Sequence, residues 1–218
     1  MPMTKKSSAG KTGRPPKVPG EKPTREKIFD AAIELFSEKG YDRTTVRDIA
    51  GAAGITESAV YRHYPGKESI LDAIFEYMEV RVYSPLPPLP DSGNQKENTI
   101  FRDLLEGLPR YMVSEPVLAR IIRILFMEMH HNEKIRDYIK REYVERAEDY
   151  TEALFQKQID DNKIRSCDPR VLAEVFNAFR STWLFRNFII DYGKTPDVQA
   201  MEEELRPHIE FFERFFVP

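Results

Sequence analysis

The chain has 218 residues, of which 41% are hydrophobic and 32% charged, and its formal net charge is −3. These values describe a globular protein of one or two domains. No apolar run approaches the roughly 18 residues of a membrane span and no signal peptide is present, so we expect a cytoplasmic protein. Cys167 is the only cysteine, which excludes an intrachain disulfide.

The charge is distributed unevenly along the chain. Residues 1–70 contain 13 Lys and Arg against 9 Asp and Glu, a net of +4, whereas residues 71–218 contain 20 against 27, a net of −7. A basic end on an acidic body suits a nucleic-acid partner. Residues 1–23 predict a disordered basic arm, in which Gly13-Arg14-Pro15-Pro16-Lys17 resembles half of an AT-hook. A non-specific basic arm is the simpler interpretation.

Three short helices are predicted after this arm. Residues 24–39 carry one apolar stripe and should end at Gly40; the stripe consists of Ile28, Ala31, Ala32, Leu35 and Phe36. Thr44 can cap a second helix that ends before Gly54, and its apolar positions are Val46, Ile49, Ala50 and Ala53. Thr56 can cap a third helix, in which Ala59 and Val60 should pack inward.

The outward face of the third helix is polar, aromatic and cationic. Its residues are Glu57, Ser58, Tyr61 and Arg62. Two helices joined by a tight turn, with such a face on the second, predict a helix-turn-helix whose reading helix enters the DNA major groove. A plain three-helix bundle with a solvated face is the alternative.

Residues 25–71 resemble the N-terminal domain of the TetR (tetracycline-repressor) family of transcription regulators. The resemblance rests above all on Lys39-Gly40-Tyr41, Thr44-Thr45-Val46-Arg47-Asp48-Ile49-Ala50 and Tyr61-Arg62-His63-Tyr64-Pro65. It implies an all-α fold, with a basic arm at 1–23, a helix-turn-helix domain at 24–70 and a helical effector-binding and dimerisation domain at 71–218.

The resemblance also implies three groups of DNA contacts. The groove-facing positions are Arg47, Ser58, Ala59 and Arg62; the phosphate and sugar contacts are Tyr61, His63 and Lys67; the backbone anchors are Thr45 and Thr56. Two of these positions have structural alternatives, because Tyr61 can pack against the first helix and His63 can serve as a spacer. Glu57 can accept from a cytosine amine or favour the helix dipole.

The remainder of the chain predicts further helices and no strand. A helix from Lys67 to about Ser84 should link the two domains, and the Pro-rich residues 85–98 should form a mobile loop. Pro109 should kink or end a helix that begins near Asn98. Later starts are expected at Pro116, after Asn132, at Asp168-Pro169 with an end at Gly193, and at Thr195-Pro196.

The helix over 168–192 is apolar around roughly half of its circumference, which is wider than one core face needs. One half can pack on the chain's own core and the other on a second copy, so we expect a homodimer held by residues of about 168–216. A central helix buried within a monomer is the alternative. The family resemblance points to an intersubunit four-helix bundle.

Large adaptable side chains in the helical body suggest an effector pocket. Its candidate residues are Phe101, Tyr111, Met112, Met127, Phe176, Phe179, Arg180 and Trp183. Each apolar member can instead be ordinary core, and Arg180 can pair with an acidic ligand or with an internal carboxylate. His130 and His131 are adjacent and point about 100° apart on a helix, so they do not form a metal-chelating pair.

The sequence therefore predicts a ligand-responsive regulator, a repressor released from a palindromic DNA operator by a small and largely apolar effector. An effector between the 101–129 region and the 176–183 helix would push on the 67–84 helix. No set of nucleophile, base and acid stands at usable spacing, so we expect no enzyme, no catalytic residue, no cofactor and no metal. An architectural DNA-binding protein without effector control is the alternative function.

Overall fold

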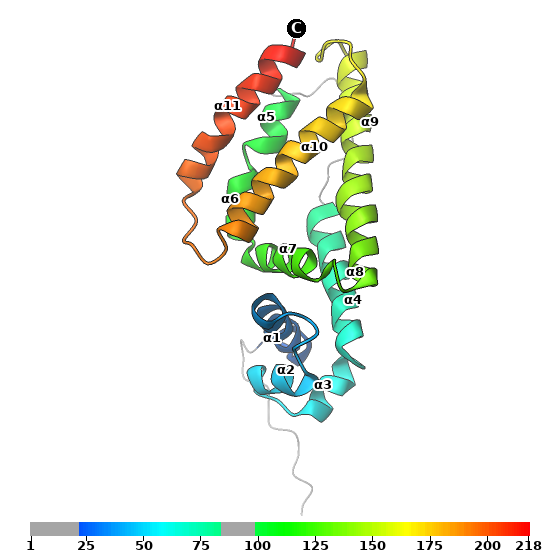
Figure 1. The fold of residues 1–218 in the computed structure, drawn as a ribbon, viewed down its shortest axis with the longest axis vertical. Coiled ribbons are helices and arrows are strands. Elements are labelled where there is room, and N and C mark those ends of the chain that lie inside the picture. Colours follow the sequence, from blue (N-terminus) through cyan, green and yellow to red (C-terminus); the bar gives the residue numbers. More distant parts are fainter. Residues whose placement is uncertain (1–21, 84–98) are drawn as a thin grey trace, which may run out of the picture.

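The computed structural model describes residues 22–83 and 99–218, and these residues form helices without any strand (Figure 1). The all-α prediction is therefore confirmed. The predicted AT-hook half and Pro-rich loop lie outside the described residues, as does the basic arm apart from Lys22 and Pro23. Lys22 forms an ion pair with Asp30 at 2.6 Å.

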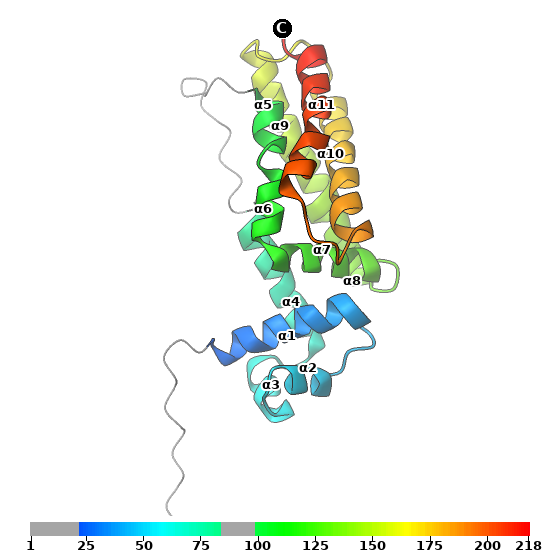
Figure 2. The ribbon, with the colours of Figure 1, turned by 90° about the vertical axis from the view of Figure 1, so that its left-hand side faces the viewer.

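The N-terminal part consists of α1 (Thr24–Lys39), α2 (Val46–Ala52), α3 (Glu57–His63) and α4 (Lys67–Met78). Figure 2 shows α1 lying across the base of the molecule, with α2 and α3 beneath it. As predicted, α1 ends at Gly40, and Gly54 follows α2 with a φ of 67°. The predicted domain boundary at residue 70 falls inside α4, which continues through the π-helical turn η1 (Glu79–Tyr83).

The prediction that Thr44 caps α2 is wrong by one residue. The N-cap is Thr45, whose hydroxyl accepts from the backbone N–H of Asp48 at 3.1 Å. Thr44 is instead buried, and its hydroxyl donates to the carbonyl of Gly40 at 2.8 Å. Either threonine could cap α2 on the basis of its neighbours in the sequence. Thr45 is the cap because the connection between α1 and α2 buries Thr44.

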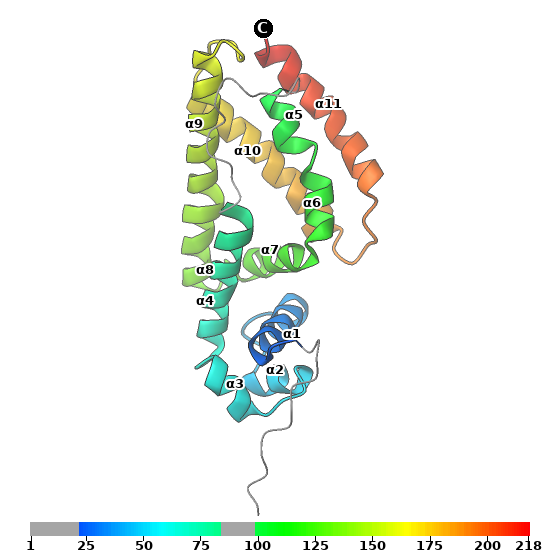
Figure 3. The same cartoon turned by 180° about the vertical axis from the view of Figure 1, so that it is seen from behind.

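The body consists of α5 (Ile100–Leu105), α6 (Leu108–Ser114), α7 (Pro116–Glu128), α8 (Glu133–Tyr138), α9 (Arg146–Asp160), α10 (Pro169–Phe185) and α11 (Val198–Phe216). Two π-helical segments prolong these helices, η2 (Ile139–Glu145) between α8 and α9, and η3 (Arg186–Ile190) after α10. Figure 3 shows α4 rising from α3 to lie beside α8 and the lower part of α9.

The helix starts in the body follow the predicted caps with one exception. Asn132 accepts from the N–H of Ile135, and Asp168 accepts from two N–H groups of the first turn of α10. The last helix does not begin at Thr195-Pro196, because Asp197 is its N-cap and accepts from the N–H of Ala200 at 3.1 Å. The Asp197 carboxylate accepts a hydrogen bond from a backbone N–H at the start of the helix, whereas the side chain of Pro196 has no acceptor.

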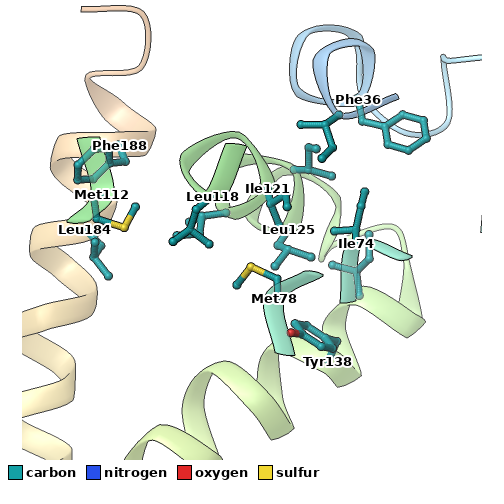
Figure 4. Packing of buried hydrophobic residues seen from close by; sticks show 14 of the residues in the cluster. Phe36, Ile74, Met78, Met112, Leu118, Ile121, Leu125, Tyr138, Leu184 and Phe188 are labelled. Atoms are coloured by element: carbon teal, nitrogen blue, oxygen red, sulfur yellow. The ribbon is translucent and has the colours of Figure 1, made fainter. Parts of the chain in front are cut away.

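Helix α7 connects the N-terminal helices with the body through one hydrophobic cluster (Figure 4). Ile121 and Leu125 of α7 lie toward Phe36 of α1 and Ile74 of α4. At the other side of α7, Leu118 lies near a group of side chains from α6, α10 and η3, which are Met112, Leu184 and Phe188. The cluster therefore joins the helix-turn-helix helices α2 and α3, the reading head, to the long helices of the body.

Candidate DNA-binding surface

Two capped helix starts hold the helix-turn-helix in place. The Thr45 backbone N–H donates to the Asp48 carboxylate at 2.9 Å, which completes a capping box. Hydrogen bonds from the side chain and the backbone of Thr45 lower the pKa of Asp48. At the start of α3, the Thr56 hydroxyl accepts from the N–H of Ala59 at 3.3 Å. In each helix a buried apolar residue lies four positions after the capping threonine. This spacing fixes which face of the helix is exposed.

The exposed face of α3 contains Ser58, Tyr61, Arg62 and His63, and Tyr61 is 50% exposed. The alternative that Tyr61 packs against the first helix is not what the structure shows. Ala59, in contrast, is buried at 8% exposure. Its methyl group packs inward, as the apolar pattern predicted, and does not share the exposed face.

Arg47 on α2 and Arg62 on α3 are both exposed. In the part of the chain that the structure describes, neither guanidinium group forms a hydrogen bond or an ion pair. A free guanidinium can donate two parallel hydrogen bonds to guanine, which is the most frequent specific contact in the major groove. The end of the molecule formed by α2 and α3 therefore presents two unpaired planar cations.

Lys67 has a structural contact that the sequence did not reveal. Its Nζ atom donates to the carbonyl of Tyr41 at 2.7 Å and lies 4.4 Å from the centre of the Tyr41 ring. The start of α4 is thereby tied to the α1–α2 connection. Lys67 is partly buried, so a phosphate contact by this side chain has to compete with the Tyr41 carbonyl.

Two side chains of α7 bind the backbone next to the helix-turn-helix. The buried Glu128 carboxylate accepts from the N–H of Tyr41 at 2.8 Å, and Arg123 Nε donates to the carbonyl of Ser37 at 3.0 Å. These partners are 87 and 86 residues apart in the chain. No local pattern in the sequence marks such long-range bonds, so neither Arg123 nor Glu128 is predicted from the sequence as a contact of the helix-turn-helix.

In the described part of the chain, the predicted effector-pocket residues Met112 and Met127 border two different cavities. Phe101 is fully buried, and its ring lies 5.4 Å from that of Phe155, 6.2 Å from that of Phe176 and 5.2 Å from that of Phe212. These four rings fill the space that was expected to admit a ligand. Phenylalanines at this spacing gain more from packing on one another than from lining a void.

The other candidates lie in several separate places. The Phe179 ring stacks on the His208 ring with 4.4 Å between the ring centres, and the rings of Trp183 and Phe188 pack with their centres 6.0 Å apart. Tyr111 is 39% exposed and donates to the carbonyl of Arg81, while Met127 lies beside Gly40. Arg180 is partly buried on α10. Met112 is the member of the set that borders a cavity between α6, α7 and η3.

The helix-turn-helix region matches a known family. Residues 28–74 match the model of bacterial regulatory proteins, tetR family. Over 67 residues, 31% of this chain and 28% of the relative, the sequence is 43% identical to the HTH-type transcriptional repressor KstR2 of Rhodococcus jostii. Residues 28–74 are a DNA-binding domain of the TetR family. The chain is a DNA-binding transcriptional regulator rather than an enzyme.

More distant relatives cover more of the chain. The nucleoid occlusion factor SlmA of Vibrio cholerae is 27% identical over 150 residues, which is 68% of this chain and 76% of SlmA. The structure of a SmeT–triclosan complex superposes with a TM-score of 0.70 and 22% identity, over 89% of this chain and 92% of SmeT. This likeness shows that the described part of the chain has the TetR-type fold.

Within the described ranges, no helix combines the length and the apolarity needed to cross a membrane.

Proposed function

We propose that this chain is an effector-responsive repressor that binds a palindromic operator as a homodimer. The observation that carries the proposal is the exposed face of the helix-turn-helix, with the unpaired guanidinium groups of Arg47 and Arg62. Ser58, Tyr61 and His63 extend the same face and can reach phosphate or sugar oxygens. Thr45 and Thr56 stand at two helix N-termini, where backbone N–H groups favour phosphate.

The homodimer is supported by apolar side chains that the single chain leaves exposed on α10, η3 and α11. The exposed fractions are 52% for Val171, 53% for Val175, 38% for Phe185, 64% for Ile190, 52% for Phe211 and 53% for Phe215. On α10 the spacing of these residues, together with Ala178 and Thr182, forms one continuous stripe. Exposed apolar patches of this kind mark interaction surfaces.

A two-fold dimer also matches the geometry of duplex DNA. Two helix-turn-helix heads read two half-sites about 34–36 Å apart, and the two-fold axis of the protein corresponds to the palindrome. An effector then acts through its differential affinity for two spacings of the heads, with a coupling of typically 1–3 kcal/mol. KstR2 is named a repressor, which supports the repressor role proposed here. SmeT was solved with triclosan, which supports the binding of a small effector.

The DNA-reading role is tested by replacing Arg62 with alanine. An operator is first selected from randomised duplexes with the unmodified protein, and affinities for operator and random duplex are then compared. Arg62→Ala should cost about 1–3 kcal/mol of discrimination, because a bidentate contact to guanine is lost. Arg141→Ala is the matched control, since Arg141 is also exposed but lies on η2 in the body.

The two results lead to opposite conclusions. A drop in discrimination that is confined to Arg62→Ala supports α3 as the reading helix. Unchanged discrimination by Arg62→Ala in competition gel shifts means that α3 does not read the base sequence. A failure to select any operator from the pool contradicts the sequence-specific regulator itself and favours an architectural DNA-binding protein.

A second prediction concerns the basic arm. Because Lys22 is held by Asp30, the deletion is confined to residues 1–21, which carry five basic residues and one acidic residue. Loss of these charges should lower operator affinity and flatten its dependence on salt, because fewer counterions are released on binding. Titrations at several salt concentrations measure the slope. A loss limited to A·T-rich duplexes supports the AT-hook interpretation, whereas a uniform loss supports a non-specific arm.

A further inference from the structure

A cavity of about 250 Å³ lies where α6, α7 and η3 meet. Its floor is apolar, because Met112 and Phe188 are buried at 3% and 6% exposure. Its remaining walls include Arg120 of α7, Asn187 of η3, and Asp191, Tyr192 and Lys194 of the connection between η3 and α11. The cavity is separate from the packed phenylalanines between α5, α9 and α11.

One cation in this cavity is unpaired. Lys194 is paired with Asp191 at 2.5 Å, so the two charges cancel. Arg120 is partly buried, and among the described residues its guanidinium forms no hydrogen bond or ion pair. The cavity therefore carries one net positive charge beside an apolar floor. A partly buried guanidinium without a carboxylate partner is the group that a planar anion binds best.

We infer that this cavity binds the effector, and that the effector is a small monocarboxylate with an apolar body. The inference rests on the proposed effector-responsive function. The carboxylate pairs with Arg120, and the apolar part lies on Met112 and Phe188. The cavity is smaller than the roughly 300–1,000 Å³ of sites for drug-sized ligands, which restricts the class to acids of the size of benzoate or hexanoate.

The cavity wall is connected to the reading head through one residue. The guanidinium of Arg123 lies 4.2 Å from the centre of the Tyr192 ring, and its Nε atom donates to the carbonyl of Ser37 at 3.0 Å. Tyr192 lines the cavity, whereas Ser37 belongs to the last turn of α1. An acid that moves the Tyr192 ring changes the hold of Arg123 on α1, and α1 carries the helix-turn-helix.

The binding part is tested by calorimetry on the full chain without DNA. The probes are benzoate and hexanoate, and benzamide and hexanamide are their uncharged counterparts. We expect the acids to bind and the amides to bind at least about tenfold more weakly, because a charge-assisted hydrogen bond is lost. Arg120→Gln should weaken benzoate by a similar factor, and Arg120→Lys should recover part of the loss because it keeps the charge.

Two controls separate this site from binding elsewhere. Arg141→Gln removes an exposed arginine of η2 and should leave benzoate affinity unchanged. Circular dichroism establishes that each variant is folded. Equal affinity for acids and amides, unchanged binding by Arg120→Gln in a folded protein, or no binding at millimolar benzoate would each overturn the inference.

The coupling is tested by titrating benzoate with and without the selected operator. By reciprocity, operator should weaken benzoate by the factor by which benzoate weakens operator. Arg123→Gln should bring that factor toward one, because Arg123 joins the cavity wall at Tyr192 to Ser37 of α1. Operator binding without acid binding contradicts this inference alone, whereas acid binding without operator binding contradicts the regulator proposal alone.

Discussion

Replacing Val175 with aspartate is expected to give a monomer that binds its operator roughly 10²–10⁴-fold more weakly. Val175 is 53% exposed in the single chain and lies in the middle of the apolar stripe of α10. In the proposed dimer a carboxylate at this position would be buried without a partner on both sides of the two-fold axis. In the dimer, binding of one head raises the effective concentration of the other head at the second half-site. A monomer lacks this gain, and its loss sets the size of the expected decrease in operator affinity.

Sedimentation velocity and operator titration measure the two parts of this prediction. The stability of the folded monomer should change little, because the substituted side chain faces solvent there. Val144→Asp is the matched control, since Val144 is 42% exposed but lies on η2, outside the stripe. A Val175→Asp protein that remains a dimer with full operator affinity would show that another surface joins the two copies.

Replacing Gly40 with alanine is expected to destabilise the protein by about 1–3 kcal/mol and to weaken operator binding. Gly40 has φ 88° and ψ 158°, a combination that is essentially restricted to glycine. A Cβ atom there would also lie 2.9 Å from Oε1 of Glu128, the atom that accepts from the Tyr41 N–H. The substitution therefore strains the backbone and disturbs the contact between α7 and the reading head.

Urea unfolding gives the change in stability, and Gly51→Ala provides the control. Gly51 lies inside α2, and a Cβ atom at that position would have no close contact within 4 Å. Alanine there should stabilise the protein by about 0.5–1 kcal/mol, because glycine is unfavourable within a helix. Equal stabilities for the two variants would contradict the strained conformation of Gly40. A second variant, Glu128→Ala, removes the Tyr41 contact without backbone strain and should weaken operator binding as well.

The sequence by itself determined the reading head. Glycines at 40 and 54, caps at 56 and 168, and apolar positions three and four residues apart are local signals, and the structure follows them. Such signals depend on the conformation and hydrogen bonding of a few neighbouring residues, which is why a single chain reveals them. The exposure of Tyr61 and Arg62 followed from the same spacing.

The tertiary structure decided which of two equivalent local choices is used. Thr44 and Thr45 can both cap α2, and burial of Thr44 against Gly40 leaves the cap to Thr45. Phe101 and Phe176 suit a pocket wall or a core equally well, and the arrival of Phe155 and Phe212 from other helices makes them core. These outcomes depend on residues that are distant in the chain.

The same reason explains why the connection between the body and the reading head was missed. Arg123 and Glu128 are ordinary charged residues on an amphipathic helix, and only the packing of α7 against α1 brings them to Ser37 and Tyr41. That Arg120 has no carboxylate partner among the described residues likewise depends on which side chains the surrounding helices bring near it. Periodicity gives the face of a helix, but the partner across that face is set by the three-dimensional arrangement of all the helices.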